Sequence, residues 1–531
     1  MHITSKIGLR KVKSGCAVLA ILALSASASW GQPLSSGPQV ATFFSFVDDT
    51  DQPYGLYIPK NFDDQKKYPL VISLHGAFSN HRLNLKRVFG KGNKSGETDA
   101  EATRYFPAVR EVEYIVASPL ARGTMGYQGI AEEDVYAVLE DVKKRFRIDE
   151  DRVYLTGLSM GGGGTLWLGL TRPDVWAAIA PVCPAPPVGT EPLAGNALNY
   201  PVKLFQGEID PLVKAEQTRG WHRRFQGLGT NVEYVEFPGV KHNSWDNAYA
   251  DGAIFDWFAK HKRRAHPDRV RFATWSYKYP KAYWVTLDSF VPSTLASIDA
   301  KITGASKLEI VTSNLDGFTL TLDSRKPWTV TVDGTKLTAR ELSFRKQAGV
   351  WKMGKAPAAT KKVASIAEAL GKRHIYIYGT ADDPEPAELA RRREEAQKLA
   401  EWGTPRTPLL LTLKAMADRE VQDSDLATGA NLVLLGNATT NSLIAKYGDT
   451  FPIRLRADAA DYSLVFVAPA SDRHVVVMSG RPFPTTPRPF QPNPFQRDYI
   501  LMRGTETLAT GSFTGDWKLS ETLPDVVEVN R

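Results

Sequence analysis

The sequence predicts an α/β protein: a mostly parallel, doubly wound sheet, then a small β-sandwich-like region, then a small three-layer α/β domain. Three observations support this fold class. Apolar strands alternate with amphipathic helices over residues 38–265, which is typical of a parallel sheet with helices on both faces. Short strands separated by turn residues fill residues 268–353, as in an antiparallel sandwich. Strand and helix patterns alternate again over residues 363–531.

Length and composition support a globular chain with several domains. At 531 residues the chain is too long for one hydrophobic core. It is 43% hydrophobic and 23% charged, as folded domains are. The predicted segments are a signal peptide (1–31), an α/β domain (38–265), a β-rich domain (268–353) and a small α/β domain with C-terminal strands (363–531).

The N-terminus has the three parts of a signal peptide. Cations precede an apolar stretch at 15–24, and small residues follow at 25–29. The cations are Lys6, Arg10, Lys11 and Lys13. This pattern predicts a secreted or periplasmic protein, and the apolar stretch is too short to span a bilayer. Removing residues 1–31 lowers the formal net charge from +8 to +4, because 8 − 4 = 4.

Strands and helices are expected in a regular order in the first domain. The predicted strands are 43–46, 54–58, 68–74, 114–119, 152–156, 202–205 and 232–237, and the predicted helices are 132–146, 215–227 and 252–262. The polar stretch 84–103 is either a cover over a site or a solvated loop. Cys183 has no partner in a mature chain and is interpreted as a small buried residue.

Residues after 268 contain shorter elements. Predicted strands at 297–303, 308–312, 318–322 and 328–332 form the antiparallel sandwich; the third region has strands at 374–378, 431–435, 462–467 and 474–478 and helices at 386–401 and 439–447. The turn at 436–439 either holds an anion at a helix N-terminus or simply caps the helix, and capping is the favoured interpretation. Residues 354–362 read as a linker, and the proline-rich stretch 482–494 as an extended surface segment.

The run Gly157-Leu158-Ser159-Met160-Gly161 carries the strongest chemical signal. It follows an apolar strand and leads into a helix, which is the context that gives the G-x-S-x-G pattern its meaning. The sharp turn exposes the Ser159 hydroxyl at the end of the sheet. A serine hydroxyl is a weak nucleophile, so it needs a base and an acid that orients the base.

Both partners follow in the expected order. Asp210 lies on the loop after the strand at 202–205, and His242 on the loop after the strand at 232–237. The order Ser159, Asp210, His242 is that of α/β-hydrolases. Glu208 is the rival acid.

The strand at 68–74 leads into a loop that can supply an oxyanion hole. The predicted donors are the backbone N–H groups of Met160 and Ala77, with Phe78 as the alternative to Ala77. His75 competes with His242 as the base, but its position upstream suits bracing this loop. Phe78 and Trp245 are candidate substrate-binding residues, and a buried structural role for Trp245 is equally compatible with the sequence.

The first domain resembles secreted polyhydroxybutyrate depolymerases and feruloyl esterases, a branch of α/β-hydrolases often labelled prolyl-oligopeptidase-type. The resemblance rests on residues 151–162, 177–183, 207–210 and 239–245. Family members often carry His-Gly before the acid loop where this chain has Gln206-Gly207, a departure not expected to touch the triad. The resemblance covers residues 38–265 and implies a serine hydrolase.

Three functions fit these motifs: a carboxylesterase for acyl or feruloyl-type esters, a prolyl-oligopeptidase-type peptidase, and a binding protein with a relic triad. The complete triad favours an enzyme. We expect a small-molecule or polymer-linked ester as substrate and neither a cofactor nor a metal, since no metal-ligand spacing occurs. Basic patches with interleaved aromatics are absent, so nucleic acid is not expected. The oligomeric state does not follow from the sequence.

Overall fold

The computed structural model describes most of the chain. The described residues are 35–323, 325–355, 364–403, 409–470, 472–481, 483, 496–514, 516–519 and 521–530. The predicted signal peptide lies wholly outside them, and the predicted linker (354–362) and proline-rich stretch (482–494) lie largely outside them.

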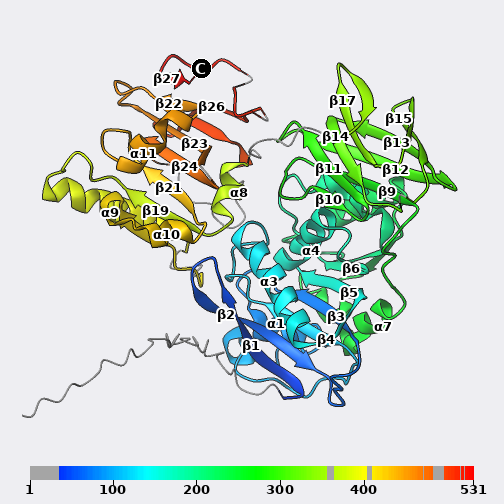
Figure 1. The fold of residues 1–531 in the computed structure, drawn as a ribbon. Helices are drawn as coiled ribbons and strands as arrows, with labels where there is room; N and C mark the ends of the chain where they lie inside the picture. Colours follow the sequence, from blue (N-terminus) through cyan, green and yellow to red (C-terminus); the bar gives the residue numbers. More distant parts are fainter. Residues whose placement is uncertain are drawn as a thin grey trace, which may run out of the picture. The chain divides into compact units, whose positions relative to one another are not determined.

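An eight-stranded sheet forms the core of the first part of the chain (Figure 1). Its strand order is β1-β2-β4-β3-β5-β6-β7-β8. β2 is antiparallel to both of its neighbours, and the strands from β4 to β8 are parallel. The strands are β1 (Gly37–Ser45), β2 (Thr50–Ile58), β3 (Tyr68–Leu74), β4 (Ile115–Pro119), β5 (Ile148–Leu158), β6 (Ala178–Val182), β7 (Val202–Gly207) and β8 (Val232–Phe237).

Helices pack on both faces of this sheet, as predicted. The helices are α1 (His81–Arg87), α2 (Asp99–Ala102), α3 (Ile130–Arg145), α4 (Met160–Thr171), α5 (Ala215–Gly227), α6 (Trp245–Ala248) and α7 (Ala253–Phe258), with 3-10 turns η1 (Glu191–Asn199) and η2 (Ala250–Gly252). Residues of α1 and α7 share a buried cluster with Ala178 and Ala180 of β6. α4 packs against Ile179 through Gly169, and successive residues of a strand face opposite sides.

The polar stretch 84–103, for which a cover over a site and a solvated loop are the two alternatives, contains helical segments. Its first residues belong to α1, which Asn80 caps by accepting hydrogen bonds from two backbone N–H groups, and α2 begins at Asp99 with a capping box. The last predicted helix, 252–262, is shorter than expected, because α7 ends at Phe258. The helix at 215–227 has the predicted bounds.

The β-rich region contains two five-stranded sheets, in the orders β10-β11-β14-β17-β18 and β16-β15-β13-β12-β9. The strands are β9 (Arg269–Thr274), β10 (Lys281–Ala282), β11 (Val285–Phe290), β12 (Ala296–Gly304), β13 (Lys307–Ser313), β14 (Leu315–Leu320), β15 (Trp328–Val332), β16 (Thr335–Ala339), β17 (Ser343–Gln347) and β18 (Val350–Met353). The expectation of a wholly antiparallel sandwich is wrong, since β13 and β15 are parallel. The chain between them crosses to the other sheet as β14 and returns.

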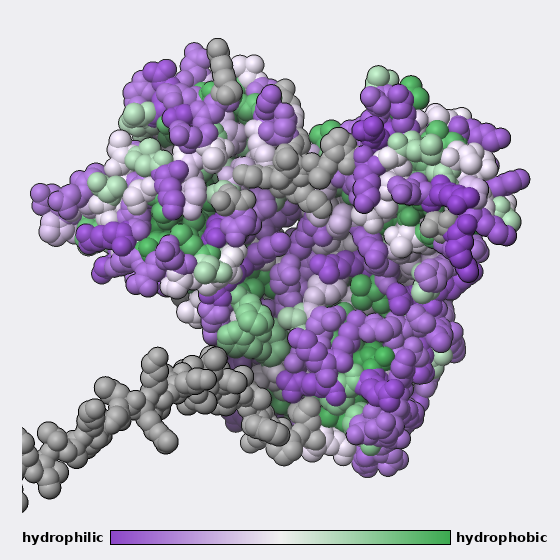
Figure 2. All heavy atoms as spheres, viewed as in Figure 1, coloured by the Kyte–Doolittle hydropathy of each residue, from purple (hydrophilic) through white to green (hydrophobic). Residues whose placement is uncertain are grey.

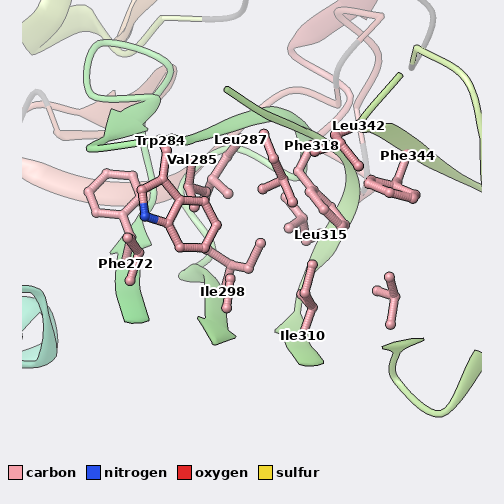
Figure 3. Close-up of a cluster of buried hydrophobic side chains, with 14 of the residues drawn as sticks. Phe272, Trp284, Val285, Leu287, Ile298, Ile310, Leu315, Phe318, Leu342 and Phe344 are labelled. Atoms are coloured by element: carbon pink, nitrogen blue, oxygen red, sulfur yellow. The ribbon is translucent and has the colours of Figure 1, made fainter. Parts of the chain in front are cut away.

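Apolar side chains from both sheets fill the space between them (Figure 3). Leu287 and Phe318 come from one sheet, and Phe272 and Ile298 come from the other. All four are buried. The alternation of apolar residues along each strand, with its period of two, directs these side chains inward.

The last part of the chain forms a seven-stranded sheet in the order β20-β19-β21-β24-β23-β25-β26. β20, β19, β21 and β24 are parallel, and the remaining strands are antiparallel. The strands are β19 (His374–Tyr378), β20 (Lys414–Ala417), β21 (Asn431–Leu435), β23 (Tyr462–Ala470), β24 (Arg473–Gly480), β25 (Tyr499–Arg503) and β26 (Glu506–Gly511), and β22 (Ile453–Leu455) pairs separately with β27 (Val527–Val529).

Helices cover both faces of this sheet as well. They are α8 (Ile366–Leu370), α9 (Pro386–Ala400), α10 (Asp423–Ala427) and α11 (Ser442–Tyr447), with 3-10 turns η3 (Asp418–Glu420) and η4 (Gly448–Thr450). The predicted helix at 439–447 begins later, because Asn441 is the residue that caps α11. The turn at 436–439 is therefore a connection before the helix, and the interpretation that it caps the helix is wrong, because Asn441 supplies the cap.

Hydrophilic residues cover most of the surface seen in Figure 2. Among the described residues, no helix is both long enough and apolar enough to cross a membrane.

A buried histidine in β19 predicts how stability depends on pH. Burial lowers the pKa of His374 to about 4, whereas an unfolded histidine titrates near ~6.5. The folded chain therefore disfavours the charged form of His374. The full free energy of unfolding is present above pH ~6.5, and part of it is lost as the pH falls toward 4, because the unfolded chain then gains a proton that the folded chain does not. The loss is about 3 kcal/mol. We expect the thermal midpoint of His374→Gln to fall less between pH 7 and 4 than that of the unsubstituted chain.

His266→Gln is the matched control, since His266 is exposed. It should retain the full pH dependence. Some dependence should also remain in His374→Gln, because burial lowers the pKa of His81 to about 4 as well. An unchanged pH dependence in His374→Gln would show that His374 is not the responsible group.

Candidate active site

The backbone turn at Ser159 has the strained geometry that the motif predicts. Ser159 has φ 56° and ψ −116°, between the end of β5 and the start of α4. A positive φ is rare for a residue with a side chain. Gly161 makes the turn possible, because a Cβ there would lie 2.3 Å from the carbonyl oxygen of Leu74. The helix can therefore begin directly against the neighbouring strand β3.

The structure brings Ser159, His242 and Asp210 into one chain of hydrogen bonds. His242 Nε2 lies 2.9 Å from Ser159 Oγ, and His242 Nδ1 lies 2.8 Å from Asp210 Oδ2. An ionised carboxylate can only accept a hydrogen bond, so Nδ1 must carry the proton of the neutral imidazole. Nε2 is then assigned as the acceptor of the serine proton. The three residues follow β5, β8 and β7 at the carboxyl ends of parallel strands, which meet at one edge of the sheet.

Asp210 is buried, and its carboxylate is held by several donors. Oδ1 accepts from the backbone N–H groups of Leu212 and Val213, at 2.8 and 3.0 Å. Oδ2 accepts from Gln206 Nε2 at 3.2 Å as well as from His242. The expectation that Gln206 does not touch the triad is therefore wrong. Its amide takes part in orienting the acid, and sequence reasoning missed it because the contact depends on how the loop after β7 folds back.

Glu208 does not reach His242. Its carboxylate accepts the backbone N–H of Gly239 at 2.8 Å and stays at the surface. Glu208 thereby ties the loop after β7 to the loop after β8. Of the two candidate acids, only Asp210 has the position that an orienting acid requires.

Two backbone N–H groups are available beside Ser159. Met160 is the first residue of α4, and the N–H groups at a helix start have no partner within the helix. Among the described residues, the N–H of Ala77 makes no hydrogen bond. The alternative donor Phe78 is excluded in this structure, because its N–H donates to Thr124 Oγ1 at 2.7 Å. This contact joins residues 46 positions apart, so the sequence carried no signal for it.

His75 lies beneath this loop rather than beside the serine. It is fully buried, with Nδ1 2.7 Å from the carbonyl oxygen of Gly76 and Nε2 2.8 Å from that of Leu120. Burial lowers its pKa. These contacts brace the loop, as expected, and leave His242 as the histidine that contacts Ser159.

Aromatic side chains lie next to the triad. The Trp245 ring meets the His242 ring edge-on, with 5.5 Å between centroids. The Arg87 guanidinium lies 5.5 Å from the centroid of the Trp245 ring and is paired with Asp99 at 3.1 Å. The stretch 84–103 therefore lies beside the loop that carries His242. Phe78 is 69% exposed, which is unusual for a phenylalanine and leaves its ring available.

Further exposed apolar side chains follow the strands of the same edge. Ile209 and Leu212 lie on the loop after β7, and Val188 lies on the loop after β6. Each is more than half exposed. Cys183, at the end of β6, is instead fully buried, and its thiol lies 3.5 Å from the carbonyl oxygen of His242. Burial raises the pKa of this thiol to about 12, so it stays protonated.

Comparisons with known proteins concern the first part of the chain. Residues 49–223 match the family model described as a putative esterase. The chain is 34% identical over 165 residues to the putative esterase NocK of Nocardia uniformis subsp. tsuyamanensis, covering 30% of this chain and 43% of the relative. It is 25% identical over 173 residues to the bifunctional acetylxylan esterase/xylanase XynS20E of Neocallimastix patriciarum, covering 32% and 23%. The chain thus spans less than half the length of either relative.

Similar solved structures include a thermostable esterase and a ferulic acid esterase. The first is 24% identical, with a TM-score of 0.34, and the match covers 43% of this chain and 63% of that one. The second, a CE1 ferulic acid esterase from Anaeromyces mucronatus, is 16% identical with a TM-score of 0.33, covering 42% and 90%. The family match, together with the strand–turn–helix around Ser159, confirms the predicted α/β-hydrolase fold.

The close packing at the turn predicts a large effect of Gly161→Ala. The new Cβ would lie within 2.6 Å of two backbone carbonyl oxygens, which cannot move without shifting β3. Overpacking of this kind costs about 1–3 kcal/mol or more. We expect a clearly lower thermal midpoint.

Gly220→Ala in α5 is the matched control, since nothing lies within 4 Å of its Cβ position. It should leave the thermal midpoint unchanged or raise it. The gain in the free energy of unfolding is up to about 1 kcal/mol, because alanine has a higher helix propensity than glycine. Equal effects of the two substitutions would contradict the packing argument.

Proposed function

We propose that the α/β-hydrolase domain of this protein hydrolyses carboxylic esters through an acyl-enzyme formed on Ser159. The observation that carries this proposal is the continuous chain from Ser159 Oγ through His242 to Asp210. The match of residues 49–223 to a putative esterase model supports it.

Ser159, His242 and Asp210 have different roles in the proposed mechanism. Ser159 Oγ attacks the ester carbonyl carbon while His242 Nε2 takes its proton. Asp210 holds the imidazole in the required tautomer and stabilises the imidazolium that forms. The N–H groups of Met160 and Ala77 donate to the oxyanion of the tetrahedral intermediate.

Three further proton transfers complete the cycle. His242 gives its proton to the departing alkoxide, and the acyl group remains on Ser159. Water then attacks the acyl-enzyme while His242 takes one of its protons, and that proton returns to Ser159 Oγ as the carboxylic acid leaves. The alcohol and the acid are the two products.

The surroundings of Ser159 favour an ester with an apolar or aromatic acyl group. The exposed ring of Phe78 belongs to the loop after β3, the ring of Trp245 packs against His242, and both offer apolar contact surface. A feruloyl-type acyl group has this character. The name of one relative, an acetylxylan esterase, agrees with an ester carried on a polysaccharide.

We also propose that the protein acts outside the cytoplasm, as a secreted or periplasmic enzyme. The support is the cationic, apolar and small-residue pattern in residues 1–31. Mass spectrometry of the N-terminus of the exported protein tests this, and retention of the unprocessed chain in the cytoplasm would contradict it.

A substrate panel tests the proposed reaction. p-Nitrophenyl acetate and methyl ferulate should be hydrolysed, and a dipeptide p-nitroanilide should be hydrolysed slowly or not at all, since an amide needs timed protonation of its nitrogen. In Ser159→Ala kcat should fall on the order of 10⁶-fold, and a fluorophosphonate probe should no longer label the chain. Rapid anilide cleavage with negligible ester turnover would favour a peptidase.

The two acids next to β7 provide a matched pair of variants. Asp210→Asn should lower kcat by about 10⁴-fold, because the imidazole loses the partner that sets its tautomer. Glu208→Gln should leave kcat within about twofold, as expected for a surface substitution. The thermal midpoint of each variant shows whether it is folded. A greater loss of kcat in Glu208→Gln would mean that the acid is misassigned.

A further inference from the structure

The seven-stranded C-terminal sheet has a point where its connections diverge. From β19 the chain passes through α9 to β20 on one side, and it then returns to β21 on the other side of β19. Residues of α9 share a buried cluster with Tyr376 and Tyr378 of β19, whereas residues of α11 share another with Ile375 and Ile377. The two helices therefore cover opposite faces. In open α/β sheets, ligands bind outside the carboxyl ends of the strands at such a point.

A cavity of about 310 Å³ lies at this point. It is lined by the ends of β19 and β21, by the residues after β24 and by one face of α9. Its volume is at the lower end of the range of small-molecule pockets, roughly 300–1,000 Å³. The cavity belongs to a different sheet from the one that carries Ser159.

Buried polar side chains hold the walls of this cavity in place. Asn441 Nδ2 donates to the carbonyl oxygens of Ile377 and Leu435, at 3.1 and 3.2 Å, and so joins the ends of β19 and β21. Asp418 accepts from the N–H groups of Thr380 and Ser442, at 2.9 and 2.7 Å. A pocket held this way needs little reorganisation when a ligand binds.

Glycines allow the two loops to close on each other. A Cβ at Gly379 would lie 2.1 Å from the carbonyl oxygen of Thr440, and a Cβ at Gly436 would lie 2.4 Å from Thr440 Oγ1. Gly436 also has φ +116°, a conformation that side chains disfavour. The asparagine cap of α11 occupies that helix's first N–H groups, so the ligand contacts must come from elsewhere.

Guanidinium groups provide these contacts. Arg392 is committed to the protein, since it donates to Asp382 and to the carbonyl oxygen of Gly379. Arg391 donates to both carboxylate oxygens of Glu388, through Nε at 2.7 Å and through Nη2. Its Nη1 and Arg481 Nη2 also approach one carboxylate oxygen of Glu395, at 3.5 and 3.0 Å, without a hydrogen bond to it. Their side chains are 45% and 39% exposed. A guanidinium has five N–H donors, so both retain donors for a ligand.

The lining combines guanidinium groups with apolar surface. Three arginines and two glutamates line the cavity, and Asp382, which does not line it, pairs with Arg392, so the formal charges balance at 3 − 3 = 0. Burial raises the pKa of Glu395, and the nearby Arg391 lowers it in part. Tyr378, Leu435 and Phe483 line the remainder.

We propose that this cavity is a second binding site, for a small organic anion whose carboxylate or phosphate contacts Arg391 and Arg481 and whose apolar body packs against Tyr378, Leu435 and Phe483. Guanidinium recognises both anionic groups through paired N–H donors. The site is independent of the proposed hydrolytic reaction.

Calorimetric titration of the full chain with benzoate, phenyl phosphate and benzamide tests this proposal. At least one of the two anions should bind saturably, and neutral benzamide should bind at least about tenfold more weakly. The tighter anion identifies the preferred group. Arg481→Gln should weaken anion binding by about tenfold or more, as loss of a charge-assisted hydrogen bond does. Arg391→Gln is the second variant if Arg481→Gln does not fold.

Arg393→Gln is the matched control. Arg393 lies on the same helix, contacts Tyr378 Oη at 3.2 Å and does not line the cavity. It should bind the anions as the unsubstituted chain does. The absence of saturable binding of both anions, equal binding of benzamide, or equal weakening in Arg393→Gln and Arg481→Gln would each overturn the proposal.

Discussion

The packing of α4 against β3 is the constraint on which the site depends. Gly161 lies so close to the carbonyl oxygens of Leu74 and His75 that no side chain fits between them. The chain must therefore turn sharply at Ser159, with a positive φ. This turn lifts the serine above the carboxyl edge of the sheet. The loops after β3, β7 and β8 reach the same edge because their strands are parallel to β5.

The electrostatics of the site begin at Asp210. A buried carboxylate is costly unless donors surround it, and this one has two backbone N–H groups, Gln206 Nε2 and His242 Nδ1 around it. With the carboxylate held in this way, the imidazole has one favourable orientation, with Nε2 toward Ser159. The edge contact with Trp245 limits the ring further, and the Arg87 guanidinium lies 5.5 Å from the centroid of the Trp245 ring.

The same topological rule applies twice in this chain. In the eight-stranded sheet, the carboxyl edge of the parallel strands carries a nucleophile, a base and an acid. In the C-terminal sheet, the corresponding edge carries a cavity with arginines and apolar residues. The β-sandwich-like region has a different organisation, with a core made of alternating side chains from two facing sheets (Figure 3).

The sequence alone determined the features that depend on near neighbours. The strand–turn–helix at Ser159, the order of Asp210 and His242, the bounds of α5 and the strand at 374–378 follow from local residue patterns and period. Asn80, which caps α1, is also a local signal for a helix start. The helix was not predicted, because the residues that follow Asn80 are largely polar.

Tertiary structure decided what depends on residues distant in the chain. Thr124 takes the N–H of Phe78 and so leaves Ala77 as the free donor of that loop. The parallel pairing of β13 with β15 follows from the path of the intervening strand in the other sheet. Arg481 meets Glu395 only because β24 ends beside α9. Periodicity reports which face of an element is buried, but it holds no information about which distant element covers that face.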